Sequence, residues 1–127
     1  MAGNIVLLKS NGTVPEIDLK FGFAQFAKYR ILLWDKDGKN PVEVAHGINI
    51  DAVPDRFPVG TSVADLDGRF ITWQAVIASP TGGQGEQFSQ KATFIQDGAT
   101  CPNSPFNQSG PLNNTVTTFD QAQFKVE

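Results

Sequence analysis

The segment Arg69–Gln96, RFITWQAVIASPTGGQGEQFSQKATFIQ, decides the fold class. Apolar residues recur at alternate positions in both of its halves: Ile71, Trp73, Ala75 and Ile77 in the first, and Phe88, Ala92 and Phe94 in the second. A period of two is typical of a β-strand with one buried face. The Gly-rich stretch Pro80–Gly85 between the halves is typical of a hairpin tip. The segment therefore predicts two long antiparallel strands, with Trp73 in the core.

The same alternation continues on both sides of this segment. The apolar positions are Ile17, Leu19, Phe21 and Phe23; Tyr29, Ile31 and Leu33; Val42 and Val44, with His46 continuing their face; and Ala122, Phe124 and Val126. Asp37-Gly38 and Asp67-Gly68 supply the residues that tight hairpin turns need. No dozen residues keep a helical apolar stripe without an intervening Gly or Pro. We therefore expect an all-β chain of six to eight strands that forms one domain over residues 1–127.

Two antiparallel sheets packed face to face, a β-sandwich, fit this pattern best. Pro54 and Pro58 bracket the irregular segment Val53–Val59, which we expect to carry the chain from one sheet to the other. The alternative is a closed barrel, but unequal strand lengths and this long crossing disfavour it. In strand spacing the chain resembles an immunoglobulin or fibronectin type III sandwich, above all in Arg69–Gln96. It lacks the paired cysteines of immunoglobulin domains, so the resemblance implies an architecture and no function.

One stretch interrupts the alternation. Residues 98–119 contain no charged side chain, and 101–111 are rich in Pro, Asn, Ser and Gly. We expect a long neutral loop over 98–114, followed by a final strand over 115–127. Loops of this length are uncommon unless they are functional, packed on the domain or mobile.

Composition excludes several classes of protein. The chain has 127 residues, a net charge of −3 and one cysteine. The negative charge disfavours a nucleic-acid partner, and no apolar run is long enough for a membrane helix. A single cysteine allows no internal disulfide. The N-terminal apolar run Ile5–Leu8 is too short for a Sec signal, so we expect a cytoplasmic protein or one exported without such a signal.

Two Asp-rich turns could bind a metal. Asp35 and Asp37 precede Gly38, and Asp65 and Asp67 precede Gly68. Alternating carboxylates suit Ca²⁺, which makes these four residues candidate calcium ligands, but the spacing departs from the EF-hand pattern. Ordinary turns explain the same residues, so we expect no cofactor.

Catalytic signatures are absent from the sequence. Cys101 and His46 are the only residues of their kinds, and nothing in the sequence suggests that they meet as a nucleophilic pair. The chain lacks a nucleophile elbow, a P-loop and a dinucleotide fingerprint. The region 35–67 holds seven acids and three bases, so a hydrolytic enzyme that uses this acidic region is an alternative.

Trp34 is the leading candidate for ligand contact. It shares the strand face of Lys28 and Arg30, and Leu32 lies on that face too. A partly exposed indole beside carboxylates suits sugar stacking, so the candidate ligand-binding residues are Trp34, Asp35, Asp37 and Phe106. The alternative is that Trp34 and Leu32 pack under the neutral loop or against a second copy of the chain.

These residues predict a non-catalytic recognition or self-assembly module. Within that class we expect a homo-oligomer, most simply a dimer, with lectin-like carbohydrate binding as the more specific variant. The dimer would use the face of Trp34 or, less favourably, the edge of the final strand. Besides the hydrolase, a further alternative is a structural domain of a larger surface or secretion-associated assembly.

Overall fold

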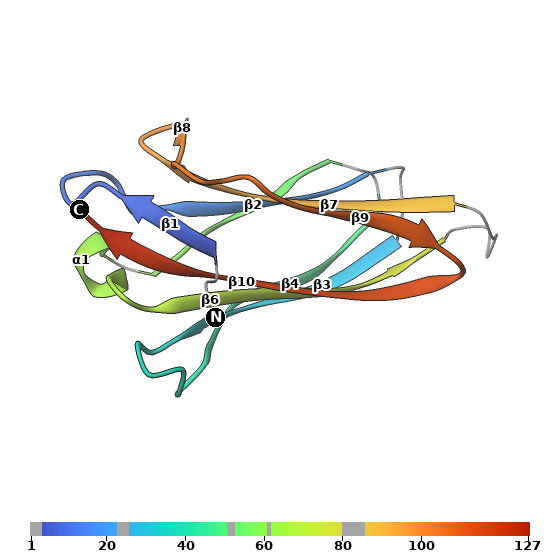
Figure 1. Cartoon of the computed structure of the whole chain (residues 1–127), viewed down its shortest axis with the longest axis horizontal. Coiled ribbons are helices and arrows are strands. Elements are labelled where there is room, and N and C mark those ends of the chain that lie inside the picture. The colour runs from blue at the N-terminus through green and yellow to red at the C-terminus, as the bar shows by residue number, and fades with distance from the viewer. Residues whose placement is uncertain (1–3, 23–25, 51–52, 61, 80–85) are drawn as a thin grey trace.

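The computed structural model describes residues 4–22, 26–50, 53–60, 62–79 and 86–127, and it consists of two facing layers of β-sheet (Figure 1). The strands are β1 (Asn4–Leu8), β2 (Glu16–Phe21), β3 (Phe26–Trp34), β4 (Val42–Asn49), β5 (Asp55–Pro58), β6 (Phe70–Ala78), β7 (Glu86–Gln96), β8 (Ala99–Thr100), β9 (Phe106–Leu112) and β10 (Thr115–Val126). One short helix, α1 (Val63–Leu66), precedes β6 among these residues. The expected all-β, two-sheet sandwich is confirmed at this level.

Sheet A has the strand order β1-β10-β6-β3-β4, and sheet B has the order β5-β2-β7. Both β8 and β9 pair with β7, on the edge opposite to β2. The pairs are antiparallel, except that β1 runs parallel to β10, with Asn4 beside Ala122 and Leu8 beside Val126. In Figure 1, sheet B forms the upper layer and sheet A the lower one.

The hairpin expected over Arg69–Gln96 is not formed. Both strands are present, but β6 pairs with β10 and β3 in sheet A, whereas β7 pairs with β2, β8 and β9 in sheet B. The connection Pro80–Gly85 lies outside the described residues. Alternation locates a strand and its buried face, but it does not say which strand lies next to it.

The long neutral loop expected over 98–114 is also wrong, because β9 occupies Phe106–Leu112 and pairs with β7 from Ala92 to Glu86. Most of its side chains are polar or small and lie at the sheet edge, so no apolar period reveals the strand. The final strand, β10, is confirmed over Thr115–Val126. It pairs with strands on both sides, so the expected free edge there is wrong.

The core lies between the sheets at the positions that the alternation marks. Trp73 is 1% exposed, and its ring lies 5.6 Å from Phe94 and 6.0 Å from Phe106, measured between ring centroids. The other marked positions that are buried are Ile17, Leu19, Phe21, Tyr29, Ile31, Leu33, Ile71, Ala75, Ile77, Phe88, Ala92, Ala122 and Phe124. Phe23 lies outside the described residues.

A polar pair crosses the core between the sheets. Thr118 of β10 donates a hydrogen bond from its Oγ1 to Oε1 of Gln90 in β7, at 2.6 Å. Both side chains are buried, and Nε2 of Gln90 has no hydrogen-bond partner among the residues that the structure describes. The pair ties sheet A to sheet B, at the cost of desolvating an amide.

The β4 strand departs from the expected alternation. The register shifts between Ile31 and Leu32, which leaves Val44 as an extra residue. Val44 and Ala45 both pack against the core as a result, while His46 lies exposed on the opposite face. The interpretation that His46 continues the Val44 face is therefore wrong. A β-bulge of this kind redirects every side chain that follows it.

The two Asp-Gly turns differ from each other. Asp37-Gly38 joins β3 to β4, and Gly38 has the positive φ of 75° that was expected. Asp67-Gly68 instead lies between α1 and β6, with φ of 80° at Gly68, so it ends a helix rather than forming a hairpin. The segment Val53–Val59 does connect the sheets, and it contains the edge strand β5.

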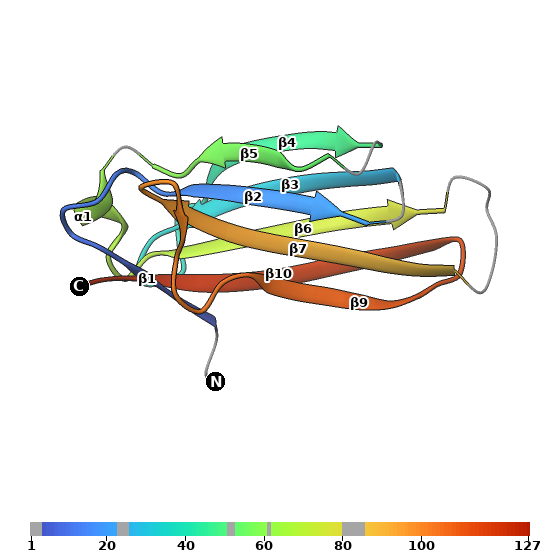
Figure 2. The same ribbon diagram turned by 90° about the horizontal axis from the view of Figure 1, so that it is seen from above.

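A partly buried cluster of hydrogen bonds links the two sheets where β4 and β5 lie next to each other (Figure 2). The Tyr29 hydroxyl donates to Oδ2 of Asp55 at 2.8 Å. Asn49 donates from Nδ2 to the same oxygen at 3.2 Å and to the carbonyl of Val53 at 2.6 Å. A side chain at Gly47 would collide with the Tyr29 hydroxyl, so this position requires glycine.

Candidate functional site

The outer face of sheet A, which points away from sheet B, carries the expected candidate Trp34. It is built from the residues that alternate with the buried ones, so Lys28, Arg30, Leu32 and Trp34 project from β3 while Tyr29, Ile31 and Leu33 point into the core. The neighbouring strands add Phe70, Thr72, Gln74 and Val76 from β6, Thr117, Phe119 and Gln121 from β10, and Glu43, His46 and Ile48 from β4.

One end of this face forms an aromatic hollow of about 300 Å³. It is lined by Trp34, Gly38, Phe70, Thr72, Phe119 and Gln121. The Trp34 indole N–H donates to Oγ1 of Thr72 at 3.0 Å, which fixes the orientation of the ring. Phe119 is 56% exposed, an unusual position for a phenylalanine. The hollow therefore offers apolar ring surface beside an amide and a hydroxyl.

The middle of the face forms a second, polar hollow of about 530 Å³. Its outward-pointing residues are Lys28, Arg30, Glu43, His46, Gln74, Val76 and Thr117. Nε of Arg30 lies 3.3 Å from Oε2 of Glu43, and His46 Nδ1 is paired with the other carboxylate oxygen. The hydrogen bond from His46, together with the charges of His46 and Arg30, lowers the pKa of Glu43.

Strand register places the two hollows next to each other. Phe119 of β10 pairs with Gln74 of β6, Gln74 pairs with Arg30 of β3, and Arg30 pairs with His46 of β4. One row across four strands therefore runs from the aromatic hollow into the polar one. Adjacent strands are about 4.8 Å apart, so Phe119 and Arg30 are separated by about 10 Å.

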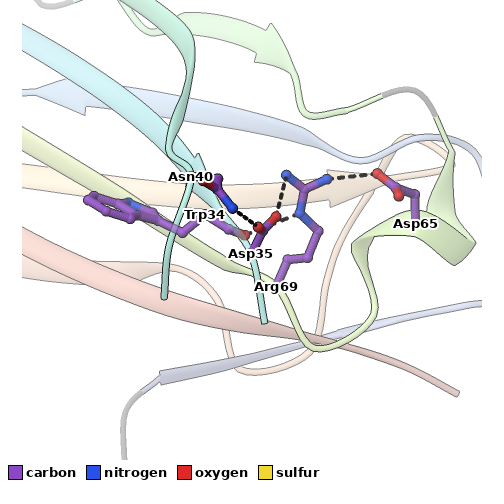
Figure 3. Close-up of polar contacts among 5 residues, drawn as sticks. All are labelled: Trp34, Asp35, Asn40, Asp65 and Arg69. Carbon is purple, nitrogen blue, oxygen red and sulfur yellow. Dashed lines mark hydrogen bonds and ion pairs between the residues drawn. The ribbon is translucent and has the colours of Figure 1, made fainter. Parts of the chain in front are cut away.

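The candidate acid next to Trp34, Asp35, lies against Arg69 rather than in the aromatic hollow (Figure 3). The Arg69 guanidinium binds Oδ2 of Asp65 at 2.7 Å and approaches Oδ1 of Asp35 at 4.0 Å, and its Nε donates to the Trp34 carbonyl at 3.1 Å. Asn40 donates to Oδ2 of Asp35 at 2.7 Å. This arrangement, which we call the Arg69 clamp, ties the β3–β4 turn to α1. The Trp34 ring points away from it.

The four expected ligand-binding residues are not brought together. Asp35 faces the Arg69 clamp, Asp37 lies exposed in the β3–β4 turn, and Phe106 lies in β9 of sheet B, where it packs against Trp73 and Phe94. Of these four residues, only Trp34 lines the aromatic hollow. The sequence analysis missed Phe119, although its place in β10, out of phase with the buried Ala122 and Phe124, marks it as outward-facing.

Three of the calcium candidates, Asp35, Asp37 and Asp65, line one open hollow of about 470 Å³, but the basic side chains of Lys36 and Arg69 line it with them. Asp67 accepts a hydrogen bond from the Val126 backbone at 2.9 Å, while Asp35 and Asp65 belong to the Arg69 clamp. Within the part of the chain that the structure describes, no three His, Cys, Asp or Glu side chains converge as a metal site.

Cys101 and His46 do not form a pair either. Cys101 is buried beside β8, where its backbone N–H donates to the Phe94 carbonyl, and His46 is exposed on sheet A. Burial raises the pKa of the Cys101 thiol, and the negative charge of Asp97 adds to that effect. The thiol is therefore held in its less reactive protonated form.

Comparisons with protein-family models, with curated proteins and with solved structures found no significant match to this chain. Among the described residues no helix has the length and apolar character needed to cross a membrane.

Proposed function

We propose that this chain is a non-catalytic recognition module that binds carbohydrate on the outer face of sheet A. The observation that carries the proposal is the aromatic hollow, where Trp34, Phe70 and Phe119 surround Thr72 and Gln121. Sugar rings present apolar C–H faces and a periphery of hydroxyl groups, so a binding site needs flat apolar surface with hydrogen-bonding groups beside it. The hollow supplies both kinds of group on adjacent strands.

The rigidity of the site supports the same proposal. Its side chains project from regular strands rather than from loops, and the Trp34 ring is fixed by its hydrogen bond to Thr72. Ordering a rigid surface on binding costs little conformational entropy. The volume of about 300 Å³ is at the lower end of the range for small-molecule sites, which suits one sugar ring within a longer chain.

A calorimetric titration with soluble neutral and acidic oligosaccharides tests the proposal. We expect at least one of them to bind, and Phe119→Ala to weaken its binding about tenfold or more. The matched control is Phe26→Ala. Phe26, like Phe119, is an exposed phenylalanine of sheet A, but it lies in β3 and lines neither hollow. Failure of every oligosaccharide to bind, or equal effects of the two substitutions, would overturn the proposal.

Self-association is a second candidate use of the same face. Exposed apolar side chains extend beyond the aromatic hollow, with Val76 48% and Ile48 66% exposed. Exposed apolar side chains of this kind are common at protein contacts, and two-fold dimers are the commonest assemblies. A dimer formed through this face would cover Trp34 and Phe119.

We also propose that the sandwich has an immunoglobulin- or fibronectin-like architecture, which the strand spacing and the two facing sheets support. The hydrolase alternative is less well supported, since the carboxylates of Asp35 and Asp65 are both engaged by Arg69.

A further inference from the structure

We infer that the carbohydrate is acidic, a chain of sugars bearing carboxylate groups, and that it lies across both hollows with a carboxylate over Arg30 and Lys28. This inference rests on the proposed function and adds the chemical class and the orientation of the ligand. It follows from the charges of the polar hollow and from the register that joins this hollow to the aromatic one.

The polar hollow has more basic than acidic side chains, because it contains Lys28 and Arg30 but only one acid, Glu43. Lys28 is exposed and makes no ion pair among the described residues. Arg30 contacts Glu43 through Nε, and its side chain is 54% exposed. The contact with Glu43 orients the guanidinium, so its terminal nitrogens can donate two parallel hydrogen bonds to a carboxylate. Glu43 is therefore a positioning residue for Arg30.

The two ends of the face differ in charge. The turn after Trp34 holds two acids, Asp35 and Asp37, and two bases, Lys36 and Lys39, so its charges balance. Further back along β3, Lys28 and Arg30 outnumber the single acid Glu43 of the polar hollow. Trp34 lies four positions after Arg30 in β3, which corresponds to about 13 Å along the strand. A short oligosaccharide can span this distance, whereas a single sugar cannot. We therefore place an uncharged ring face in the aromatic hollow and the carboxylate in the polar one.

The amount of charge favours carboxylated over sulfated sugars. With Lys28 and Arg30 set against Glu43, the hollow has a surplus of one positive charge before any protonation of His46, in a protein of net charge −3. A densely sulfated chain would be repelled by the rest of the molecule, whereas widely spaced single charges match the surplus. A nucleic acid fits poorly for the same reason.

The experiment compares two forms of one ligand by calorimetry: a hyaluronan oligosaccharide, which carries a carboxylate on every second sugar, and the same oligomer with its carboxylates methyl-esterified. We expect the acid form to bind more tightly, and its advantage to shrink as salt is added. Lys28→Gln and Arg30→Gln should each weaken binding of the acid form about fivefold and weaken binding of the ester much less, because the ester carries no charge. The matched control is Lys91→Gln, which removes an exposed charge from β7 in sheet B.

Each outcome separates the inference from the proposed function. Equal binding of both forms, lost in Phe119→Ala, would overturn the acidic ligand and keep carbohydrate binding. Binding of neither form, nor of any other oligosaccharide, would overturn both. Stronger binding of a heparin oligosaccharide would overturn the preference for carboxylate, and equal binding of poly-glutamate would show that charge alone is recognised, which also contradicts the inference.

Discussion

At the residue scale, Trp73 shows how far a single side chain supports this fold. It is almost fully buried, and its ring contacts two phenylalanines from sheet B, Phe94 and Phe106. Because it contacts both layers, its removal would leave a cavity between the sheets. Its indole N–H has no hydrogen-bond partner in the described part of the chain, so among these residues the stabilisation comes from packing.

We expect Trp73→Ala to lower the free energy of unfolding by about 3–5 kcal/mol, the usual effect of emptying a buried aromatic site. Urea denaturation measures this change, and Phe119→Ala is the control, because Phe119 is exposed and should cost much less. A loss below about 1 kcal/mol for Trp73→Ala would contradict the assignment of this residue to the core.

Tyr29 allows a second measurement at this scale, because it is the only tyrosine in the sequence. Burial raises the pKa of its phenol above the ordinary value of 10.0, and the hydrogen bond to Asp55 raises it further. The folded state therefore holds the phenolic proton more tightly than the unfolded state does. The resulting stability is fully present below pH 10 and is lost as the pH rises above that value.

Ultraviolet absorbance of tyrosinate should accordingly show that the phenol of the folded protein ionises well above pH 10. In Tyr29→Phe, the fall in stability above that pH should be smaller than in the unmodified chain. A phenol that titrates at its ordinary pH while the protein is still folded would show that the Tyr29–Asp55 hydrogen bond is absent.

At the element scale, the alternation predicted the buried side of β2, β3, β6, β7 and β10, but not that of β4 after its bulge. It did so because a strand that packs on one face must repeat its apolar residues with a period of two. Strand pairing could not be predicted in this way, since the backbone hydrogen bonds between strands involve no particular side chains. This is why the sequence predicts a hairpin of β6 and β7 although the two strands belong to different sheets.

Elements without apolar periodicity were missed for a related reason. Phe106 and Leu112 at the two ends of β9 pack on the core, but the side chains between them are polar or small, so the sequence of the strand resembles that of a loop. The bulge at Val44 has no sequence signal either, and it reverses the direction of His46. In the candidate site, the outward direction of Trp34 could be predicted from its position on the strand. The closeness of Phe119 and Gln121 to Trp34 could not, because it depends on the pairing of β10 with β6.

The Arg69 clamp gives a prediction for the β3–β4 turn and α1. Its guanidinium already compensates the charges of Asp35 and Asp65, so we expect calcium to leave the melting temperature unchanged. A site one hundredfold tighter than the free calcium concentration would add about 2.7 kcal/mol, a shift of several degrees for a domain of this size. A calcium-dependent shift that Asp35→Asn abolishes would contradict this reading.

At the scale of the whole molecule, light scattering tests self-association. A dimer formed through the outer face of sheet A should give a mass of two chains at micromolar concentration, and Trp34→Glu should return it to one chain. Lys91→Glu, which adds an acid to sheet B instead, should leave the dimer intact. A mass of one chain at every concentration would rule out the dimer and leave the face open for a ligand.

The parallel pairing of β1 with β10 determines how the molecule would respond to a pulling force. Both strands run in the same direction, and Glu127 donates its backbone N–H to the Leu8 carbonyl at 3.0 Å. Tension applied between Asn4 and Glu127 therefore slides the two strands past each other and loads all their hydrogen bonds together. Pulled at these two points, the domain should resist more force in an atomic force microscope than when tension between Leu8 and Glu127 peels the strands apart one bond at a time.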